Sequence, residues 1–333
     1  MTNILVTGGA GFIGSNLVHE LIKDSQNNIV VLDNFSTGKK ENLALISNNP
    51  RLKVIEGDIT NKNLVDDITK NIDMIYHLAV QCVRLSFSNP DLVHEVNSTG
   101  TLNLLNSAVK NKIKKFVYVS SSESYGTALT NGPMDENHPL RPTTVYGASK
   151  AAGELYTIGT HISHNLPMVI IRPFNSYGPY EHYEGVFGEV IPKFIIRAYN
   201  DQPLLIHGDG EQTRDFTYVL DTVKGMILAA NNDKLIGQAV NIAYGREVSI
   251  NNIAKAVLKA TGKTVPVEHT PNRPGDVRRH FADITKAKSV LGFKPEMLLE
   301  EGIVKYINWL KNQNFDFKKA LTEEVPYNWK TKW

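Results

Sequence analysis

The sequence has little cysteine, no long apolar run and no excess of either charge, and each shortage narrows the class of protein. A single cysteine, Cys82, stands among 333 residues, so no internal disulfide can form and a disulfide-built secreted scaffold is excluded. Basic residues number 36 and acidic residues 34, so the net charge of +2 predicts neither a nucleic-acid partner nor a charged membrane partner. No apolar run reaches the roughly 18 residues that a membrane-spanning helix needs.

Two further features are missing. The first residues, MTNILVTGG, lack the basic stretch and long apolar core of a signal peptide, so we expect a cytoplasmic protein. The ten histidines show no spacing typical of metal ligands, so no metal is expected.

The first half of the chain alternates short apolar runs with stretches of helical periodicity. Apolar runs without alternation suit strands that are covered on both faces, and strand-helix alternation indicates a doubly wound parallel sheet in an α/β protein. In such a sheet the ligand binds at the carboxyl ends of the strands. We predict strands near residues 3–8, 28–33, 52–58, 73–79, 114–122 and 167–173.

The pattern becomes irregular after Pro173, which divides the chain. We predict a dinucleotide-binding domain over residues 1–175 and a smaller α/β substrate domain over residues 176–333. Residues 217–245 again indicate a helix followed by a strand, so this segment is expected to return to the first domain.

A glycine loop directly follows the first predicted strand. In TGGAGFIG, Gly8 permits a tight turn, Gly11 lets a pyrophosphate approach the backbone, and Gly14 lets the next helix pack closely. Such glycines also mark plain turns, but Asp33 ends the second predicted strand. A carboxylate there can bind both hydroxyls of a ribose and would repel a 2′-phosphate, so the pair of features favours NAD over NADP. Asp58, in the motif GDI, follows the third strand and could reach the adenine.

A tyrosine and a lysine, Tyr146 and Lys150, lie four residues apart on a predicted helix, and this spacing puts both on one face. The ammonium would stabilise the phenolate of a tyrosine, whose pKa is ordinarily about 10. Ser121, at the end of the fifth predicted strand, could reach the same substrate oxygen. The three residues form a general acid-base set for removing a proton from an alcohol while hydride leaves its carbon.

The sequence resembles the extended short-chain dehydrogenase/reductase family, in particular its NAD-dependent nucleotide-sugar epimerases and dehydratases, over nearly its whole length. The resemblance is carried, in order and spacing, by the motifs TGGAGFIG, DNFSTG, GDI, HLA, YGASK, RPFNSYGP, GDGEQTRDFTYVLD and RPGDVRRHFAD.

The resemblance implies a Rossmann fold, a bound NAD, a nucleotide sugar (most often of UDP) as substrate, and a homodimer that pairs through helices around residues 92–110 and 143–163. Beyond the glycines and Asp33, it implies cofactor-binding roles for Phe12, Ile13, Asn34, Ser36, Gly38, Asp58, Ile59, Leu78, Ala79 and Asn97, besides Tyr146 and Lys150. It implies that the nucleotide diphosphate is held by Asn175, Arg214 and Arg278, and that Lys193 belongs to a segment that grips the nucleobase.

Which reaction the chain catalyses depends on the role of Glu123, an acid within SSSESYG (120–126). In this family Tyr146 and NAD oxidise the sugar at C4, and a 4-epimerase then returns the hydride to the opposite face. A 4,6-dehydratase instead needs a base near C5, and Glu123 resembles the glutamate of hexose dehydratases and uronate decarboxylases. Against this, Ser122 stands where many dehydratases have a second acid, and His280 stands where decarboxylases have an arginine. Glu123 could also serve only to shape its loop.

We therefore predict a nucleotide-sugar 4-epimerase of the UDP-glucose 4-epimerase type, with a 4,6-dehydratase that uses Glu123 as the alternative. A third possibility, a dinucleotide-binding protein without catalysis, is disfavoured because such chains typically lose the tyrosine or the lysine, and this chain keeps both.

Overall fold

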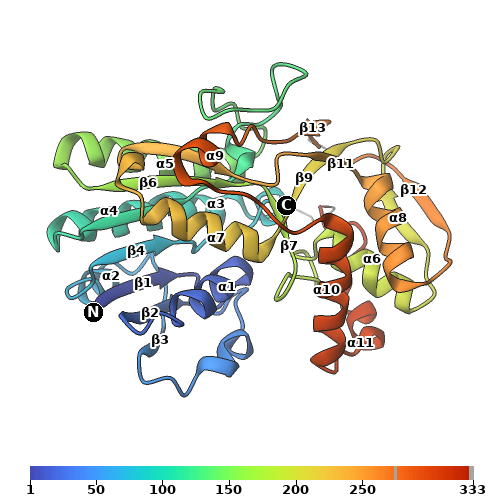
Figure 1. Ribbon diagram of the computed structural model, residues 1–333, viewed down its shortest axis with the longest axis horizontal. Helices are drawn as coiled ribbons and strands as arrows, with labels where there is room; N and C mark the ends of the chain where they lie inside the picture. The colour runs from blue at the N-terminus through green and yellow to red at the C-terminus, as the bar shows by residue number, and fades with distance from the viewer. Residues whose placement is uncertain (274–275, 330–333) are drawn as a thin grey trace.

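The six apolar runs predicted between residues 3 and 173, together with a seventh strand from residues 238–242, form a seven-stranded parallel sheet in the computed structural model, which describes residues 1–273 and 276–329. The strand order is β10-β6-β5-β4-β1-β2-β3, so β2 and β3 are added on one side of β1, and β4 and the later strands are added on the other side. The connections that leave β1 and β4 therefore diverge, which opens a crevice between the carboxyl ends of these two strands. The predicted doubly wound α/β fold is confirmed (Figure 1). The strands are β1 (Thr2–Thr7), β2 (Asn27–Asp33), β3 (Leu52–Glu56), β4 (Met74–His77), β5 (Lys115–Val119), β6 (Met168–Pro173) and β10 (Gln238–Ile242).

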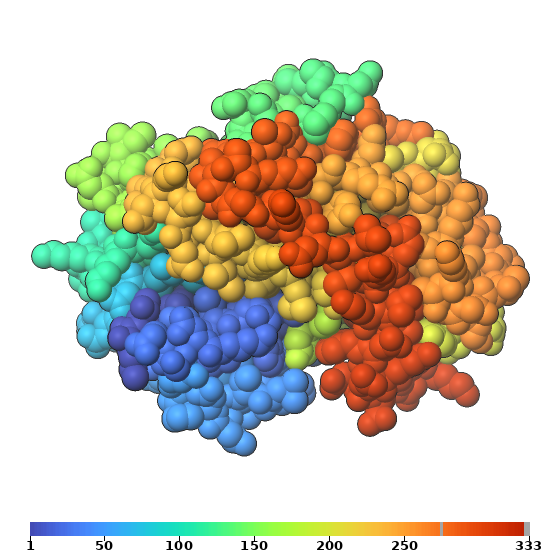
Figure 2. All heavy atoms as spheres, viewed as in Figure 1, coloured from blue at the N-terminus to red at the C-terminus, as the bar shows by residue number. Residues whose placement is uncertain are grey.

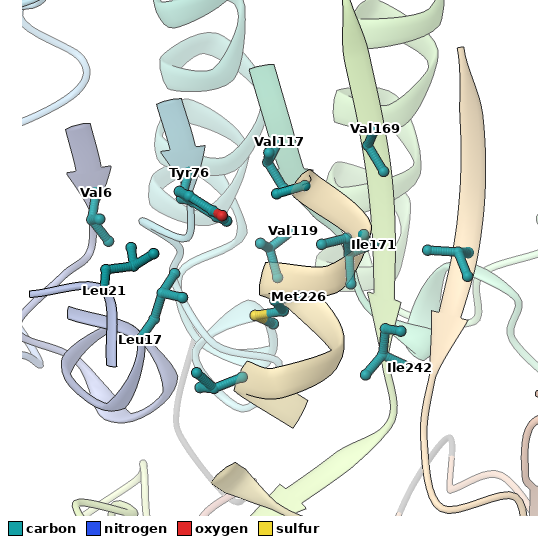
Figure 3. Packing of buried hydrophobic residues seen from close by; sticks show 14 of the residues in the cluster. Val6, Leu17, Leu21, Tyr76, Val117, Val119, Val169, Ile171, Met226 and Ile242 are labelled. Atoms are coloured by element: carbon teal, nitrogen blue, oxygen red, sulfur yellow. The ribbon is translucent and has the colours of Figure 1, made fainter. Parts of the chain in front are cut away.

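Helices cover both faces of this sheet and bury its apolar side chains. On one face Leu17 and Met226 pack against strand residues such as Val6, Val119 and Ile171 (Figure 3). On the other face Leu104 and Leu105 belong to a second buried cluster. Helices α1 (Phe12–Leu21), α7 (Val219–Ala230) and α9 (Thr285–Leu291) cover the first face, and α2 (Lys62–Ile68), α4 (Thr101–Lys110) and α5 (Val145–His164) cover the second.

The helix expected around residues 92–110 is not one regular helix. It begins as α3 (Pro90–His94), passes through a π-helical turn at Glu95–Gly100, and continues as α4. The hydroxyl of Thr101, the first residue of α4, donates to the carbonyl of Asn97 in this turn at 2.6 Å. Such π-helical turns often occur at functional sites, and this one places Asn97 beside the cavity described below.

The C-terminal lobe has its own core around α6, α8 and α10, in which Phe194, Val257 and Ile307 are buried. The helices of the C-terminal lobe are α6 (Val190–Tyr199), α8 (Ile250–Thr261), α10 (Leu299–Asn312) and α11 (Phe317–Thr322). Its strands are β7 (Asn175–Tyr177), β8 (Leu204–His207), β9 (Thr213–Tyr218), β11 (Glu247–Ser249), β12 (Val267–Thr270) and β13 (Arg279–His280). In both lobes, within the described residues, no helix is both long and apolar enough to cross a membrane.

The chain returns to the first lobe after it has entered the second. Helix α7 and strand β10 complete the sheet, with β10 hydrogen-bonded in parallel to β6. Residues 282–293 return as well, since Ala282, Ala287 and Phe293 are buried in the core of the first lobe, a return that the sequence pattern did not predict. After α9 the chain crosses the junction of the two lobes toward α10, as the orange-to-red band of Figure 2 shows.

Candidate active site

One large cavity lies at the carboxyl ends of the sheet strands and extends into the C-terminal lobe. Its wall includes most of the residues that the sequence singles out, and these are Gly8, Gly11, Phe12, Ile13, Gly14, Asp33, Asn34, Ser36, Asp58, Ile59, Leu78, Ala79, Ser121, Glu123, Tyr146, Lys150, Asn175, Lys193 and Arg214. Gly38, Asn97 and Arg278 lie outside this wall.

The glycine loop forms one end of the cavity. Gly8 has a φ of +70°, which glycine adopts without strain. A Cβ on Gly14 would stand 2.0 Å from the carbonyl oxygen of Gly8, so only glycine lets α1 begin this close to the loop. Gly11, the N-cap of α1, provides no side-chain cap, so the first N–H groups of the helix remain available to an anion. This uncapped helix start fits the pyrophosphate of a dinucleotide.

Asp33 ends β2 beside this loop and is held in place by main-chain donors. Its carboxylate accepts hydrogen bonds from the N–H groups of Ala10 and Phe35, both at 2.9 Å. Burial raises the pKa of the Asp33 carboxyl, and these two hydrogen bonds oppose the rise. Gly38 packs against Asp33, since a Cβ at Gly38 would lie 2.8 Å from Oδ1. The fixed carboxylate stands on the cavity wall, where it could accept hydrogen bonds from the ribose hydroxyls of NAD, and this role stays a prediction.

Asn34 and Asp58 close the same end of the cavity together. The amide of Asn34 donates to the Asp58 carboxylate at 2.6 Å. Burial tends to raise the pKa of Asp58, but hydrogen bonds from Thr60 and Asn34 outweigh it and the pKa is lowered. The carboxylate is therefore ionised and is positioned from two strand ends at once.

Asn97 is placed to support the cavity rather than to line it. It is buried in the π-helical turn, where its side chain accepts from the Gln81 N–H at 2.7 Å and donates to the Gln81 carbonyl at 3.1 Å. It also donates to the hydroxyl of Ser149 at 3.0 Å. Asn97 thus connects the loop after β4 to α5, next to Lys150.

Ser121, Tyr146 and Lys150 meet at the middle of the cavity. Thr144 caps the start of α5 by accepting from the Gly147 N–H at 3.0 Å, and this fixes the turn that carries Tyr146. Burial raises the pKa of the Tyr146 phenol above its ordinary value, and a hydrogen bond with the Ser121 hydroxyl opposes the rise. The phenol of Tyr146 is therefore neutral at neutral pH, and a positive charge nearby is needed to make it a base.

Lys150 is buried one helical turn after Tyr146. Its ammonium donates to the Val119 carbonyl at 2.7 Å and lies 4.6 Å from the centre of the Tyr118 ring. Burial lowers the pKa of Lys150 to about 7, against the attraction of the Glu154 carboxylate, which raises it. A lysine with this pKa can carry its proton or release it near neutral pH, a property suited to a site that moves protons.

Glu123 lies on the cavity wall in the short 3₁₀ turn Ser122–Ser124, next to Ser121. Its negative charge lies close enough to Tyr146, Arg214 and His280 to act on all three, in each case in the direction that raises the pKa. Among residues 1–273 and 276–329, no hydrogen bond or ion pair of its carboxylate is found. The structure therefore does not show the loop-shaping bonds that were one explanation for this acid.

Ser120 and Tyr125, two other polar residues of SSSESYG, belong to a buried network below the turn. The Ser120 hydroxyl donates to Glu154, and the guanidinium of Arg172 pairs with the same carboxylate at 2.6 Å. Arg172 also donates to the Tyr125 hydroxyl at 2.8 Å, and Tyr125 donates in turn to Asn241 at 2.7 Å. Sequence reasoning missed this network, although a charged residue in the apolar strand PMVIIRP was a signal that a buried partner exists.

The far end of the cavity, in the C-terminal lobe, is rich in cations. Arg214 pairs with Asp276 at 2.6 Å, and Arg273 pairs with the same carboxylate at 2.7 Å. Arg278 instead pairs with Asp209 outside the cavity, and its side chain is 59% exposed. The structure thus brings Arg273 beside Arg214, where the sequence assignment had Arg278. Two guanidinium groups that share one carboxylate leave a positive charge for a diphosphate.

Arg84 is a second cavity arginine that the sequence reading missed. It follows β4 in the first lobe, yet its guanidinium forms an ion pair with Glu189 and donates to the carbonyls of Val186 and Phe187 in the second lobe. Burial would lower the pKa of Arg84, but Glu189 outweighs it and the pKa is raised. The arginine in VQCVR, directly after a strand end, was the only sequence signal. Its contacts fasten the two lobes together across the cavity.

A glycine-loop crevice, a buried Ser-Tyr-Lys set and a cationic far end together define an enzyme of the extended short-chain dehydrogenase/reductase class. A family model described as GDP-mannose 4,6 dehydratase matches residues 5–306, and the chain belongs to this family.

Individual relatives include both epimerases and dehydratases. A Methanocaldococcus jannaschii protein provisionally named UDP-glucose 4-epimerase is 39% identical over 93% of this chain and 99% of its own length. The structure of UDP-glucose 4-epimerase from Thermotoga maritima, with UDP-glucose, is 33% identical with a TM-score of 0.88 and covers 94% of this chain and all of its own. The dTDP-glucose 4,6-dehydratase of Streptomyces venezuelae, with NAD bound, is 30% identical with a TM-score of 0.89 and covers 94% and 98%.

Proposed function

We propose that the protein is an NAD-dependent nucleotide-sugar 4-epimerase that acts on a UDP-sugar through a transient 4-keto intermediate. The observation that carries the proposal is the hydrogen-bonded Ser121 and Tyr146 pair, with Lys150 one turn away, between a dinucleotide crevice and two arginines. The similarity to UDP-glucose 4-epimerases supports the substrate class.

In this proposal the residues of the chain move one proton and hold the substrate. Tyr146 accepts the proton of the C4 hydroxyl, Ser121 hydrogen-bonds the same oxygen, and the charge of Lys150 favours the phenolate. NAD, when bound, supplies the acceptor for the C4 hydride and its return. Arg214 and Arg273 hold the diphosphate, so the sugar ring can turn over about this anchor before the hydride returns.

A 4,6-dehydratase is the second candidate, and the unpaired carboxylate of Glu123 favours it. A base at this place could take the C5 proton next to the C4 ketone. We favour epimerisation because elimination also needs an acid that gives a proton to the leaving C6 hydroxyl, and position 122, where many dehydratases have such an acid, is a serine here. Ser122 is buried, and its carbonyl contacts the His280 ring at 3.0 Å.

Incubation in deuterated water, followed by NMR, separates the two reactions. With UDP-glucose, UDP-N-acetylglucosamine and UDP-glucuronate as probes, the epimerase proposal expects C4 inversion without label in the product. We expect Glu123→Gln to reduce this reaction less than about tenfold, because no step of it needs the carboxylate.

Deuterium at C5 together with loss of the C6 oxygen would contradict the epimerase proposal. In that case Glu123→Gln should lower turnover by about 10²–10⁴-fold, the contribution of a positioned base. Absence of any conversion with every probe would contradict both candidates.

The proposal includes a homodimer, because α4 and α5 expose apolar side chains to solvent. Leu155 is 61% and Ile162 is 74% exposed on α5, and Leu102 is 39% exposed on α4. Exposed apolar side chains on neighbouring helices fit a self-complementary two-fold interface. We expect the double variant Leu155→Glu, Ile162→Glu to sediment as a monomer, while Leu45→Glu, at another exposed apolar residue, sediments like the wild type. A wild-type monomer would refute this assembly.

A cytoplasmic location is also part of the proposal. Cys82 is a free thiol, which suits a reducing compartment. Fractionation of cells that express the tagged chain would test this, and recovery outside the cytoplasm would contradict it.

A further inference from the structure

Residues 323–329, which we call the strap, follow α11 and run back across the C-terminal lobe to the cavity. The carbonyl of Glu323 accepts from the Gly185 N–H at 2.8 Å, and the carbonyl of Val325 accepts from the Lys193 ammonium at 2.8 Å. The Asn328 amide donates to the carbonyls of Val186 and Gly188, at 3.1 and 3.2 Å. The strap is therefore fixed to the segment that leads into α6.

The strap contributes directly to the cavity wall. Glu324, Pro326, Asn328 and Trp329 line it together with residues of α6 and β8. The family model ends at residue 306, so this part of the wall lies outside the sequence region that defines the family.

Aromatic rings form the apolar part of this wall. The buried Trp329 ring meets the His207 ring edge to face, with centroids 4.2 Å apart, and Tyr327 lies 5.7 Å from Trp329. Burial lowers the pKa of His207 to about 4, so the imidazole is neutral. A neutral imidazole between aromatic rings presents a flat apolar surface without competing charge.

Glu324 adds an unsatisfied acceptor to the strap. One carboxylate oxygen pairs with Arg197 at 2.9 Å, and the side chain is only 4% exposed. Its other oxygen, Oε2, is buried and has no hydrogen-bond partner among the residues that the structure describes. A buried acceptor without a partner is costly, which suggests a donor group that the protein alone does not supply.

The position of the strap along the cavity limits what it can contact. The Ser121, Tyr146 and Lys150 set lies at the sheet edge, whereas Lys193 and His207 come from α6 and β8 in the second lobe, as do Arg214 and Arg273 from β9 and the loop before β13. A nucleotide sugar with its ring at Tyr146 and its diphosphate at the arginines extends its nucleoside farther into this lobe. The nucleoside then reaches the wall that the strap builds.

We propose that the strap, through Trp329 and its neighbours, is a wall of the nucleobase subsite and contributes to the affinity for the base. This inference rests on the proposed function, because it takes a nucleoside diphosphate sugar as the substrate. Base–aromatic contacts weaken binding by about ten- to a hundredfold when the ring is removed. The base is the one part of the substrate with both a flat face for Trp329 and N–H groups for an orphan acceptor.

Calorimetric titration of the NAD-loaded protein with UDP and with inorganic pyrophosphate tests the inference. We expect Trp329→Ala to bind UDP about ten- to a hundredfold more weakly and pyrophosphate as the wild type does. In turnover assays the same variant should show a raised KM with an unchanged kcat. Val325→Ala, on the exposed side of the strap, is the matched control and should bind both probes normally.

Several outcomes would overturn the inference. Unchanged UDP affinity in Trp329→Ala would do so, and so would an equal loss for UDP and pyrophosphate, which indicates a general structural defect. Trp329→Phe retains an aromatic face and should bind UDP within a fewfold of the wild type, so it serves if the alanine variant does not fold. A wild-type protein that binds neither UDP, dTDP nor GDP would instead refute the proposed function itself.

Discussion

Tyr146→Phe should lower turnover of the nucleotide sugar by about 10²–10⁴-fold while the protein still carries NAD. Removal of the phenol oxygen takes away the group that we propose as the acceptor of the C4 proton, and the neighbouring Ser121 hydroxyl is a far weaker base. The glycine loop and Asp33 do not contact this ring, so the cofactor should remain bound. Turnover under saturating substrate and the NAD content of the purified protein are the two measurements.

The control for this experiment lies on the same helix. Tyr156→Phe removes a phenol oxygen from a side chain that is 38% exposed and does not line the cavity, so full activity is expected. If Tyr146→Phe converts its substrate as fast as the wild type, the assignment of the proton acceptor is wrong. If it loses NAD together with activity, the experiment reports on binding and the role of Tyr146 in holding the cofactor.

Glu154→Gln should lower the free energy of unfolding by about 3–5 kcal/mol. Glu154 is fully buried on α5, and its carboxylate neutralises the buried guanidinium of Arg172. The substitution leaves Arg172 charged in a site that excludes water, and such an unpaired charge is costly. Urea unfolding, followed by circular dichroism, measures the difference in midpoint and slope.

A surface pair provides the matched control for this change. Glu247 pairs with Arg279, but their side chains remain 30% and 35% exposed, so Glu247→Gln should cost less than about 1 kcal/mol. The double variant Glu154→Met, Arg172→Met should recover much of the loss, because it removes both buried charges. Equal costs for Glu154→Gln and Glu247→Gln would show that the buried network does not stabilise the fold.

The sequence could predict the sheet because its information is local. Each strand of the first lobe is an apolar run bounded by Gly, Asp, Ser or Pro, so even the end of β2 at Asp33 was placed correctly. The glycine loop and the Tyr146–Lys150 spacing are local in the same way. Short-range patterns were therefore enough to predict the fold class and to single out the residues that line the middle of the cavity.

The features that sequence reasoning missed depend on contacts between distant residues. Arg84 and Glu189 are 105 positions apart, and Lys193 and Val325 are 132 apart, so no periodicity can reveal that they meet. Arg273 and Arg278 lie in one short loop, and only the path of the backbone decides which of them faces Asp276. The π-helical turn at Asn97 is equally hidden, because its residues read as part of a continuous helix.

The repeated returns of the chain to the first lobe have a practical consequence for engineering. A gene fragment that stops at residue 175 would encode neither the edge strand β10 nor helices α7 and α9, and the flank of β6 would be left bare. The cofactor lobe is thus no transferable module. Exchanging substrate lobes between relatives would require grafts at several joints rather than one.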